Sequence, residues 1–580
     1  KQGQSLEEVK DILLAEVENL KKGNFDESIL KAIVNNYKLS QLEYLEGSYG
    51  RTDSFVTCFI NEVPWERFIN QVDNISKITK EEVVAYANEY FGNNYAVINK
   101  LQKKDPNELK IAKPAITPIF MNRDTSSAFL REIQASVVAP IEPVFVDFEK
   151  DMSILKAKND IPVLYKQNTT NDIFTLIYSF DRGTNEDKYL STAAQYLDYL
   201  GTSTMTPEQI KTAFYGLACN TSVYVSNEQT QVYVSGLGEN MKEAMKLMES
   251  VISDAQANPE ALAGLKADML KRRQNNKLNQ NANFSMLRAY NVYGPKSPAT
   301  NVLSNKEIKN LKDQELLDRI HTLNSFEHEV LYYGPMSQEE IVATINEIHN
   351  TPATLTPIVK NESFKERKIE ENEVIIAPYD AKQLYLAGYS NRGEIYNAEN
   401  APIIALYNSY FGGGMNAIVF QEMREARGLA YSAGAALSSP SKKGKTYNYN
   451  MFIATQNDKM IDALEAFDEI INQMPQSQNA FDIAKESLMA NIRTTRVVKS
   501  DVLSRYIRMR ELGLDYDINR DIFEKIQGYT MEDIVKFQQE WVKDRKYSIA
   551  ILGDAKDLDL KGLKKYGTIK KVSTEEIFGY

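Results

Sequence analysis

The stretch FGGGMNAIVFQEMREARGLAYSAGA, residues 411–435, holds an arginine and a tyrosine that could act together on a substrate. Three glycines lead into a helical pattern, Gly428 can end that helix in the left-handed conformation, and Tyr431 follows at the start of a strand pattern. Arg424 offers several fixed N–H donors to carbonyl groups, and the Tyr431 hydroxyl can donate to a developing oxyanion. The alternative is structural, because arginine on an amphipathic helix usually faces solvent and tyrosine at a strand start usually packs.

No motif of a self-contained hydrolase accompanies this pair. The chain has three histidines, His321, His328 and His349, and none stands in HExxH or HxxEH. The first is predicted late in a helix and the second in a loop or strand, so we interpret all three as packing or surface residues. GxSxG and the Walker A sequence are also missing from the sequence, and the glycines at 412–414 are not followed by GK[ST]. If the chain takes part in catalysis, part of the site comes from elsewhere.

The composition is that of a folded globular chain. Of 580 residues, 43% are hydrophobic and 25% charged. The formal net charge of −11, without a long basic run, argues against a nucleic-acid or anionic-membrane surface. The usual domain size predicts roughly three to five domains, and no apolar stretch approaches the roughly 18 residues that span a bilayer. Cys58 and Cys219 fit no disulfide framework or CxxC metal site, so we interpret them as buried thiols, with one bridge as the alternative.

A helix-then-strand pattern recurs three times at the distance of a whole domain. It begins at Ile75, Ile308 and Ile526, each time with acidic residues in the first helical turn, an apolar stripe at helical spacing, and a short β-like run. A separation of more than 200 residues is far longer than a solenoid repeat. The pattern therefore indicates duplication of a domain.

The elements upstream of this pattern differ between copies. The third copy has helix patterns at 458–474 and 481–512, preceded by strand-like alternation at 383–390 and 447–455. The first copy has the same pair of helix patterns and no strands before them. We therefore interpret residues 1–100 as the second half of a repeat whose sheet lies outside this sequence, because a genuinely shortened domain would leave its helices without a sheet to cover.

The remaining chain divides into two complete repeats and two linkers. The middle repeat, 151–350, opens with the strand patterns IPVLYKQ and DIFTLIYSF, which we expect to pair with each other. Proline-rich, irregular sequence predicts an extended linker at 101–150 and a shorter one at 351–373, before the last repeat at 374–580. Helix and strand patterns in each repeat predict an α+β fold.

The stretch described first resembles a segment of the inverted zinc metallopeptidases, the pitrilysin and insulinase family related to mitochondrial processing peptidase. In FGGGMNAIVFQEMREARGLAYS a glycine-rich turn leads into a sequence similar to the family pattern LFQELREKRGLAYS. The family has four homologous domains, each a mostly antiparallel sheet flanked by helices, in two halves that close around a chamber. The resemblance implies that residues 1–100 belong to the second domain, 151–350 to the third and 374–580 to the fourth.

The middle repeat departs from the zinc motif, as the third domain of the family usually does. Where the zinc domain reads HxxEH, the segment AAQYLDYLGTS has Gln195, Asp198 and Tyr199, and RRQNNK puts Gln274 and Asn275 where the third ligand would fall. Amides, a phenol and one carboxylate do not make the family's zinc site. The resemblance therefore implies a zinc domain outside this chain and no metal bound by the chain itself.

The resemblance assigns the substrate-contacting arginine and tyrosine of the fourth domain to Arg424 and Tyr431, while Arg427 supports the turn. We expect the C-terminal part of a zinc metalloendopeptidase, in which this chain forms chamber wall, binds peptide or unfolded polypeptide, and helps the oxyanion through Tyr431. Zinc and the general base would belong to an N-terminal domain or a separate catalytic subunit, and this chain alone is expected to be inactive. Bacterial relatives are often periplasmic.

The alternative function is a non-catalytic scaffold or peptide-binding subunit of the same fold, like the metal-less core subunits of respiratory complexes. A scaffold does not need an arginine and a tyrosine aimed at substrate. Retention of Arg424 and Tyr431 therefore favours the peptidase.

Overall fold

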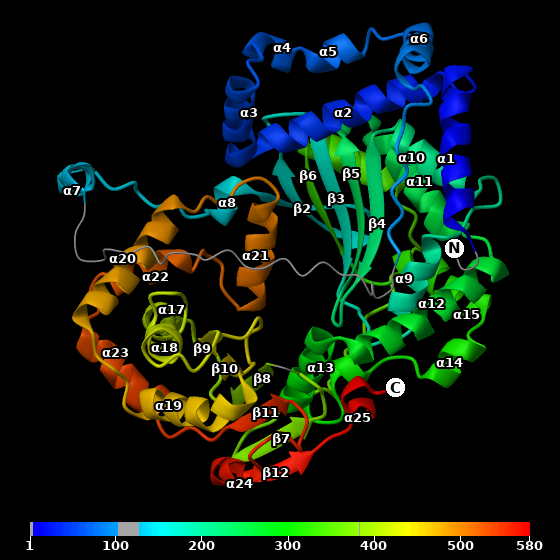
Figure 1. The fold of residues 1–580 in the computed structure, drawn as a ribbon. Coiled ribbons are helices and arrows are strands. Elements are labelled where there is room, and N and C mark those ends of the chain that lie inside the picture. The colour runs from blue at the N-terminus through cyan, green and yellow to red at the C-terminus, as the bar shows by residue number, and fades with distance from the viewer. Residues whose placement is uncertain (1–3, 102–126, 138, 382) are drawn as a thin grey trace. The chain divides into compact units, whose positions relative to one another are not determined.

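The computed structural model describes residues 4–101, 127–137, 139–381 and 383–580, which belong to two compact units (Figure 1). Unit 1 is Lys1–Glu142 and unit 2 is Pro143–Tyr580. Much of the linker expected at 101–150 lies outside the described residues. Within the described ranges, no helix has both the length and the apolar character needed to cross a membrane.

The described part of unit 1 is helical. Its helices are α1 (Leu6–Lys21), α2 (Ser28–Glu46), α3 (Ser48–Ile60), α4 (Trp65–Ile69), α5 (Gln71–Ile75), α6 (Lys80–Tyr90) and α7 (Ala128–Ala135). α6 begins at a capping box, in which the Thr79 side chain accepts the N–H of Glu82 and the Glu82 carboxylate accepts the N–H of Thr79. No strand forms among the described residues of this unit, so the β-like run expected after α6 joins no sheet.

Unit 2 contains two six-stranded mixed sheets. The strands of the first sheet are β1 (Ser153–Lys156), β2 (Pro162–Gln167), β3 (Ile173–Phe180), β4 (Cys219–Val225), β5 (Thr230–Leu237) and β6 (Glu329–Gly334). Those of the second sheet are β7 (Glu373–Ala377), β8 (Leu384–Ser390), β9 (Ser432–Ser438), β10 (Asn448–Thr455), β11 (Ser548–Leu552) and β12 (Thr568–Lys571). The strand orders, β1-β2-β6-β3-β5-β4 and β12-β7-β11-β8-β10-β9, share the same arrangement of five strands. Helices flank both sheets, which confirms the predicted α+β fold.

The helices of the described part of unit 2 fall into two sets along the chain. Those before β7 are α8 (Phe148–Asp151), α9 (Leu190–Leu197), α10 (Pro207–Gly216), α11 (Met241–Ser253), α12 (Pro259–Leu278), α13 (Gln280–Tyr293), α14 (Asn305–Asn310), α15 (Asp313–His321) and α16 (Gln338–Ile348). Those after β8 are α17 (Ala401–Phe411), α18 (Ile418–Phe420), α19 (Met460–Asn472), α20 (Gln478–Thr494), α21 (Asp501–Glu511), α22 (Asn519–Ile526), α23 (Met531–Phe537), α24 (Leu560–Leu563) and α25 (Thr574–Phe578). Cys58 in unit 1 and Cys219 in unit 2 are each free and buried.

The expected pairing of the first two strand patterns of the middle repeat is wrong. β6 lies between β2 and β3, parallel to β2 and antiparallel to β3. β6 is apolar along almost its whole length and buried on both faces, so it belongs at the centre of the sheet. The short connection from β2 to β3 crosses two strand spacings, about 10 Å, which five extended residues easily span.

The helix pattern expected at 481–512 is two helices. The hydroxyls of Thr494 and Thr495 donate to the carbonyls of Ala490 and Asn491, and Lys499 has a positive φ of 59°. Threonine side chains that bond back to the preceding turn weaken a helix, and the positive φ ends any continuation. The break separates α20 from α21.

α21 covers a face of the sheet that belongs to the other repeat. Strand residues alternate between faces, and Leu164 on β2 and Leu331 on β6 point away from the helices of their own repeat. Val502 and Leu503 of α21 pack on these two leucines and are nearly inaccessible to solvent. The first sheet is therefore closed by a helix of the last repeat (Figure 1).

Helix α13 of the middle repeat covers one face of the second sheet. Its residues Phe284 and Leu287 pack with Ala387 of β8 and Ala550 of β11, on the face opposite the helices α17 and α19. The Asn291 amide donates to the carbonyls of Ala387 and Ser548 at 3.3 and 3.0 Å, which fixes the end of α13 on the strands. The exchange of α13 and α21 makes the two repeats one compact unit.

We expect Leu287→Ala to destabilise both repeats together. The Leu287 side chain is fully buried between α13 and the second sheet, and a cavity there costs about 2 to 5 kcal/mol. In calorimetry, unit 2 of the variant should unfold at a lower temperature than in the wild type, and still in a single transition. Leu278→Ala, on a side chain that is 78% exposed, is the control and should leave it unchanged. Two separated transitions, with only one of them shifted, would contradict a shared core.

Candidate functional site

The predicted arginine and tyrosine lie on two sides of a turn that leads into β9. α18 continues into a π-helical segment, η6 (Gln421–Ala426), in which the N–H of Arg427 reaches back five residues to the carbonyl of Glu422 at 3.2 Å. Gly428 ends this helix with a φ of 58°, the left-handed conformation predicted from the sequence. π-helical turns occur often at functional sites, because they shift the side chains that follow around the helix axis.

The structure brings Arg424 and Tyr431 into contact. Arg424 Nη1 donates to the Tyr431 carbonyl at 3.1 Å, and the guanidinium carbon lies 4.9 Å from the centre of the Tyr431 ring. The Phe420 ring lies on the guanidinium as well, at 5.1 Å. Tyr431 is 70% exposed, and among the described residues no group hydrogen-bonds to its hydroxyl. Arg427 instead points at α19, where Nη1 lies 2.8 Å from Glu469 Oε2.

Two of the three glycines permit close backbone contacts beside β9. A Cβ on Gly412 would lie 1.7 Å from the Ala435 carbonyl oxygen, and one on Gly413 would lie 2.6 Å from the Asn408 carbonyl oxygen, whereas Gly414 faces open space. The Asn408 side chain meanwhile donates to the Leu437 carbonyl and accepts its N–H, both at 3.0 Å. The end of α17 thus covers part of the outer edge of β9.

Four of the five residues that the sequence compares with the zinc ligands and base of the family line one cavity of about 380 Å³. Gln195, Asp198 and Tyr199 follow one another at the end of α9, and Asn275 faces them from α12. Gln274 does not line this cavity. The Gln195 carbonyl accepts from Arg272 Nη2 at 2.7 Å, and burial raises the pKa of the Asp198 carboxyl, opposed by Lys211.

These residues do not fit zinc. Two amides and a phenol are neutral and weak ligands, and the Gln195 oxygen is already bound to a guanidinium. Across the described part of the chain, no group of three or more histidine, cysteine, aspartate or glutamate side chains could hold a metal ion.

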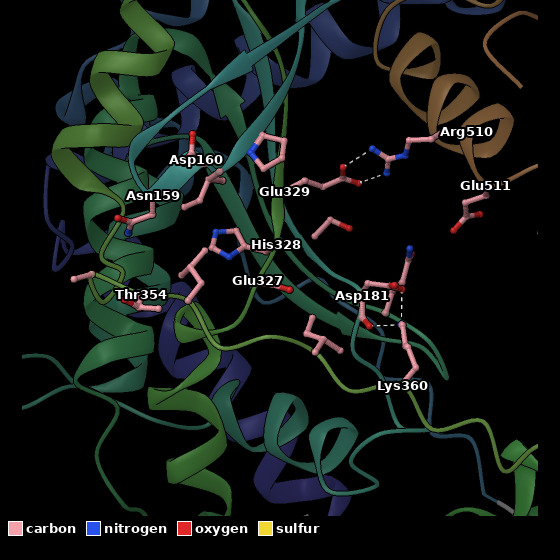
Figure 2. A pocket seen from close by; sticks show the side chains of 17 residues that line it. Asn159, Asp160, Asp181, Glu327, His328, Glu329, Thr354, Lys360, Arg510 and Glu511 are labelled. Carbon is pink, nitrogen blue, oxygen red and sulfur yellow. Dashed lines mark hydrogen bonds and ion pairs between the residues drawn. The ribbon is translucent and has the colours of Figure 1, made fainter. Parts of the chain in front are cut away.

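A larger pocket of about 970 Å³ joins the two repeats (Figure 2). Arg510 reaches from α21 to Glu329 on β6 and forms two parallel hydrogen bonds of 2.9 Å, while Lys360 pairs with Asp181 at 2.6 Å. Burial raises the pKa of the Glu511 carboxyl, which Lys442 opposes. Because the two basic residues that line the pocket are already paired with carboxylates, we interpret it as a joint between repeats rather than an anion site.

His328 forms the wall of this pocket and begins a buried chain of hydrogen bonds. Its Nδ1–H donates to the Phe326 carbonyl at 2.7 Å, which leaves Nε2 to accept from His349 Nε2 at 2.8 Å. His349 Nδ1 lies 2.6 Å from Glu249 Oε1, and the Asn324 amide donates to the other oxygen of Glu249 at 3.0 Å. Burial, with the nearby His349, lowers the pKa of His328 to about 4. No local sequence pattern indicates these hydrogen bonds, since the residues that form them are up to 100 positions apart.

Comparison with known proteins finds a family that matches part of this chain and relatives that match more of it. Residues 325–488 match the family described as the peptidase M16 inactive domain. An uncharacterized zinc protease of Rickettsia felis is 22% identical over 357 residues, covering 59% of this chain and 84% of that protein. A second, from Rickettsia bellii, is 22% identical over 414 residues, covering 67% of this chain and 94% of that protein.

Solved structures share the fold. The peptidase M16 inactive domain from Pseudomonas fluorescens has a TM-score of 0.56 at 18% identity and covers 70% of this chain and 98% of its own. The periplasmic protease PqqL from Escherichia coli has a TM-score of 0.56 at 13% identity and covers 94% of this chain and 63% of its own. The chain therefore carries the inactive domain of the M16, or pitrilysin, family and is homologous to zinc proteases of that family. The resemblance found in the sequence is confirmed.

We expect Gly412→Ala to destabilise the second sheet, because the new methyl group would overlap the backbone carbonyl of Ala435. Overpacking of this kind costs about 1 to 3 kcal/mol. Denaturant unfolding followed by circular dichroism measures the loss. Gly414→Ala, where no atom lies within 4 Å, is the matched control and should be neutral. Equal effects of the two substitutions would disprove the close contact.

We also expect the protein to lose stability as the pH falls from about 6.5 towards 4. The unfolded chain has a histidine pKa near 6.5 and folded His328 one of about 4, so the unfolded state binds more protons in this range. The contribution of His328 is complete above pH 6.5 and decreases by roughly 2 kcal/mol at pH 5. His328→Gln should weaken this pH dependence, measured by urea unfolding at pH 7.5 and 5, whereas His321→Gln on an exposed side chain should not.

Proposed function

We propose that this chain is the substrate-binding part of a zinc metalloendopeptidase whose zinc site lies outside it. The observation that carries the proposal is the contact of Arg424 with Tyr431 at the exposed start of β9. The zinc proteases among its relatives support peptide hydrolysis as the reaction.

Each side chain has a distinct part in this proposal. The guanidinium of Arg424 uses one N–H on the Tyr431 carbonyl and has others left to bind a main-chain carbonyl of an extended peptide. The Tyr431 hydroxyl donates to the oxyanion that develops when a peptide bond is attacked. The residues of the middle repeat at Gln195, Asp198 and Tyr199 take no part in metal chemistry, so we assign zinc and the general base to another domain.

Helix α1 of unit 1 has an exposed apolar face. α1 occupies the place in its repeat that α19 occupies in the last one. α19 buries its apolar stripe against the second sheet, with Met460 and Phe467 almost inaccessible. On α1 the corresponding stripe is open, with Ile12 54% and Leu13 63% exposed. We propose that this face is covered in the assembled enzyme, in which the zinc domain is supplied by the same protein or by a separate catalytic subunit.

Cleavage of a fluorogenic peptide tests the proposal. The full chain is assayed alone and mixed with a polypeptide that carries the family's HxxEH domain from the same source, with zinc and after chelation. We expect zinc-dependent cleavage in the mixture and none by the chain alone. No cleavage in any combination would favour the non-catalytic scaffold, and cleavage by this chain alone would place the catalytic groups within it.

In the active mixture we expect Tyr431→Phe to lower turnover by roughly 10² to 10³, the usual cost of one oxyanion donor. The ring and its contact with Arg424 are kept, so peptide binding should change little. Tyr224→Phe, at another exposed tyrosine on β4 of the first sheet, is the control. Unchanged turnover would remove the Tyr431 hydroxyl from the mechanism.

A further inference from the structure

We infer that Phe420 is a positioning residue that holds the Arg424 guanidinium in the orientation that binds peptide. The inference rests on the proposed function and adds a third side chain to the pair recognised from the sequence. Phe420 touches no substrate group in this assignment and acts through Arg424.

The guanidinium of Arg424 lies within cation–π distance of two aromatic rings. The guanidinium carbon of Arg424 lies 5.1 Å from the Phe420 ring centre and 4.9 Å from that of Tyr431. Both distances lie within the range of cation–π attraction. With rings against it and one N–H bonded to the Tyr431 carbonyl, the guanidinium has only its remaining N–H edge to offer a ligand.

Phe420 can pack on Arg424 because neighbouring residues of the helix fill the core in its place. Ile418, Val419 and Met423 are buried beneath the helix, whereas Phe420 is only partly buried. Phe420 and Arg424 are four residues apart, a spacing that puts side chains on one face of a helix. The aromatic ring is therefore placed on the arginine rather than needed in the core.

The Glu425 carboxylate competes with a peptide for the N–H groups of Arg424, and the Phe420 ring limits this competition. Glu425 Oε1 lies 3.6 Å from Arg424 Nε, too far for a hydrogen bond and close enough to form one after a small rotation. Without the Phe420 ring, we expect the guanidinium to turn towards Glu425 and lose the donors that face a peptide carbonyl.

The ligand is an extended peptide held by side-chain donors. Part of the outer edge of β9 is already taken, since Asn408 bonds both backbone groups of Leu437 and Gly412 lies against Ala435. Addition of a long peptide strand to this edge is thereby hindered. The orientation of Arg424 then decides how tightly the peptide is held.

The test compares Phe420→Leu with Phe420→Tyr in the full chain, with and without Arg424→Gln. Binding of a fluorescein-labelled, unstructured peptide of mixed sequence is followed by fluorescence anisotropy. Phe420→Leu should weaken binding roughly three- to tenfold, the size expected of one cation–π contact, and Phe420→Tyr should restore it. In the Arg424→Gln chain, Phe420→Leu should have no further effect. A Phe420→Leu loss that persists without the arginine would overturn the inference.

A second measurement reads the orientation without a peptide. The Nε–H proton of Arg424, identified by its disappearance in Arg424→Gln, should resonate upfield because two rings lie on the guanidinium. Because loss of the Phe420 ring current shifts this resonance in any case, the orientation is read from the nuclear Overhauser effect between the Nε–H and the Tyr431 ring protons. Phe420→Leu should weaken this effect and Phe420→Tyr should keep it, while an unchanged effect in Phe420→Leu would refute the positioning role. Peptide binding that is the same in wild type, Arg424→Gln and Tyr431→Phe would instead refute the proposed function, whatever the resonance does.

Discussion

The exchange of one helix between the two repeats of unit 2 is the constraint on which the rest of its structure depends. A sheet in this fold has an apolar residue at almost every position of its central strands, and all five residues of β11 are buried. Such a sheet needs cover on both faces. Its own repeat covers one face, and α13 or α21 of the other repeat covers the second. Neither sheet has both faces covered without its neighbour, so the two repeats are bound to fold as one body.

This double cover also explains how the turn between Arg424 and Tyr431 is held in place. β9 is the outermost strand of the second sheet, but its partner β10 is packed between β8 and β9 in a closed core. Tyr431 directly precedes β9, and the helix that carries Arg424 is anchored by Val419 and Met423 in the same core. Both exposed side chains therefore rest on buried supports. If the two side chains bind peptide as proposed, this support lowers the cost of binding, because groups that are already ordered lose less conformational freedom.

Sequence reasoning succeeded where the determining interactions are local. The helix at 458–474, the strands near 383–390 and 447–455, and the left-handed Gly428 follow from periodicity and from the backbone freedom of glycine. Arg424 and Tyr431 are only seven residues apart, so a contact between them can also be predicted from local sequence. The insertion of β6 between β2 and β3 and the ion pair of Arg510 with Glu329 join segments more than 140 residues apart, and no local pattern encodes them. The domain boundaries and the role of the arginine and tyrosine remain predictions.

In the middle repeat, the packing of α9 depends mainly on residues that do not line the cavity beside it. α9 is held against α12 and α15 by the buried residues Tyr196, Leu262 and Leu316, and the Tyr196 hydroxyl is bonded to the Asn258 backbone. None of these contacts uses the positions at Gln195, Asp198 and Tyr199, which face the cavity. The cavity thus keeps its walls whatever side chains line it. Apart from the hydrogen bond of Arg272 to Gln195, the packing of α9 rests on Tyr196 and the buried leucines, so the repeat can keep its structure with different side chains at the cavity.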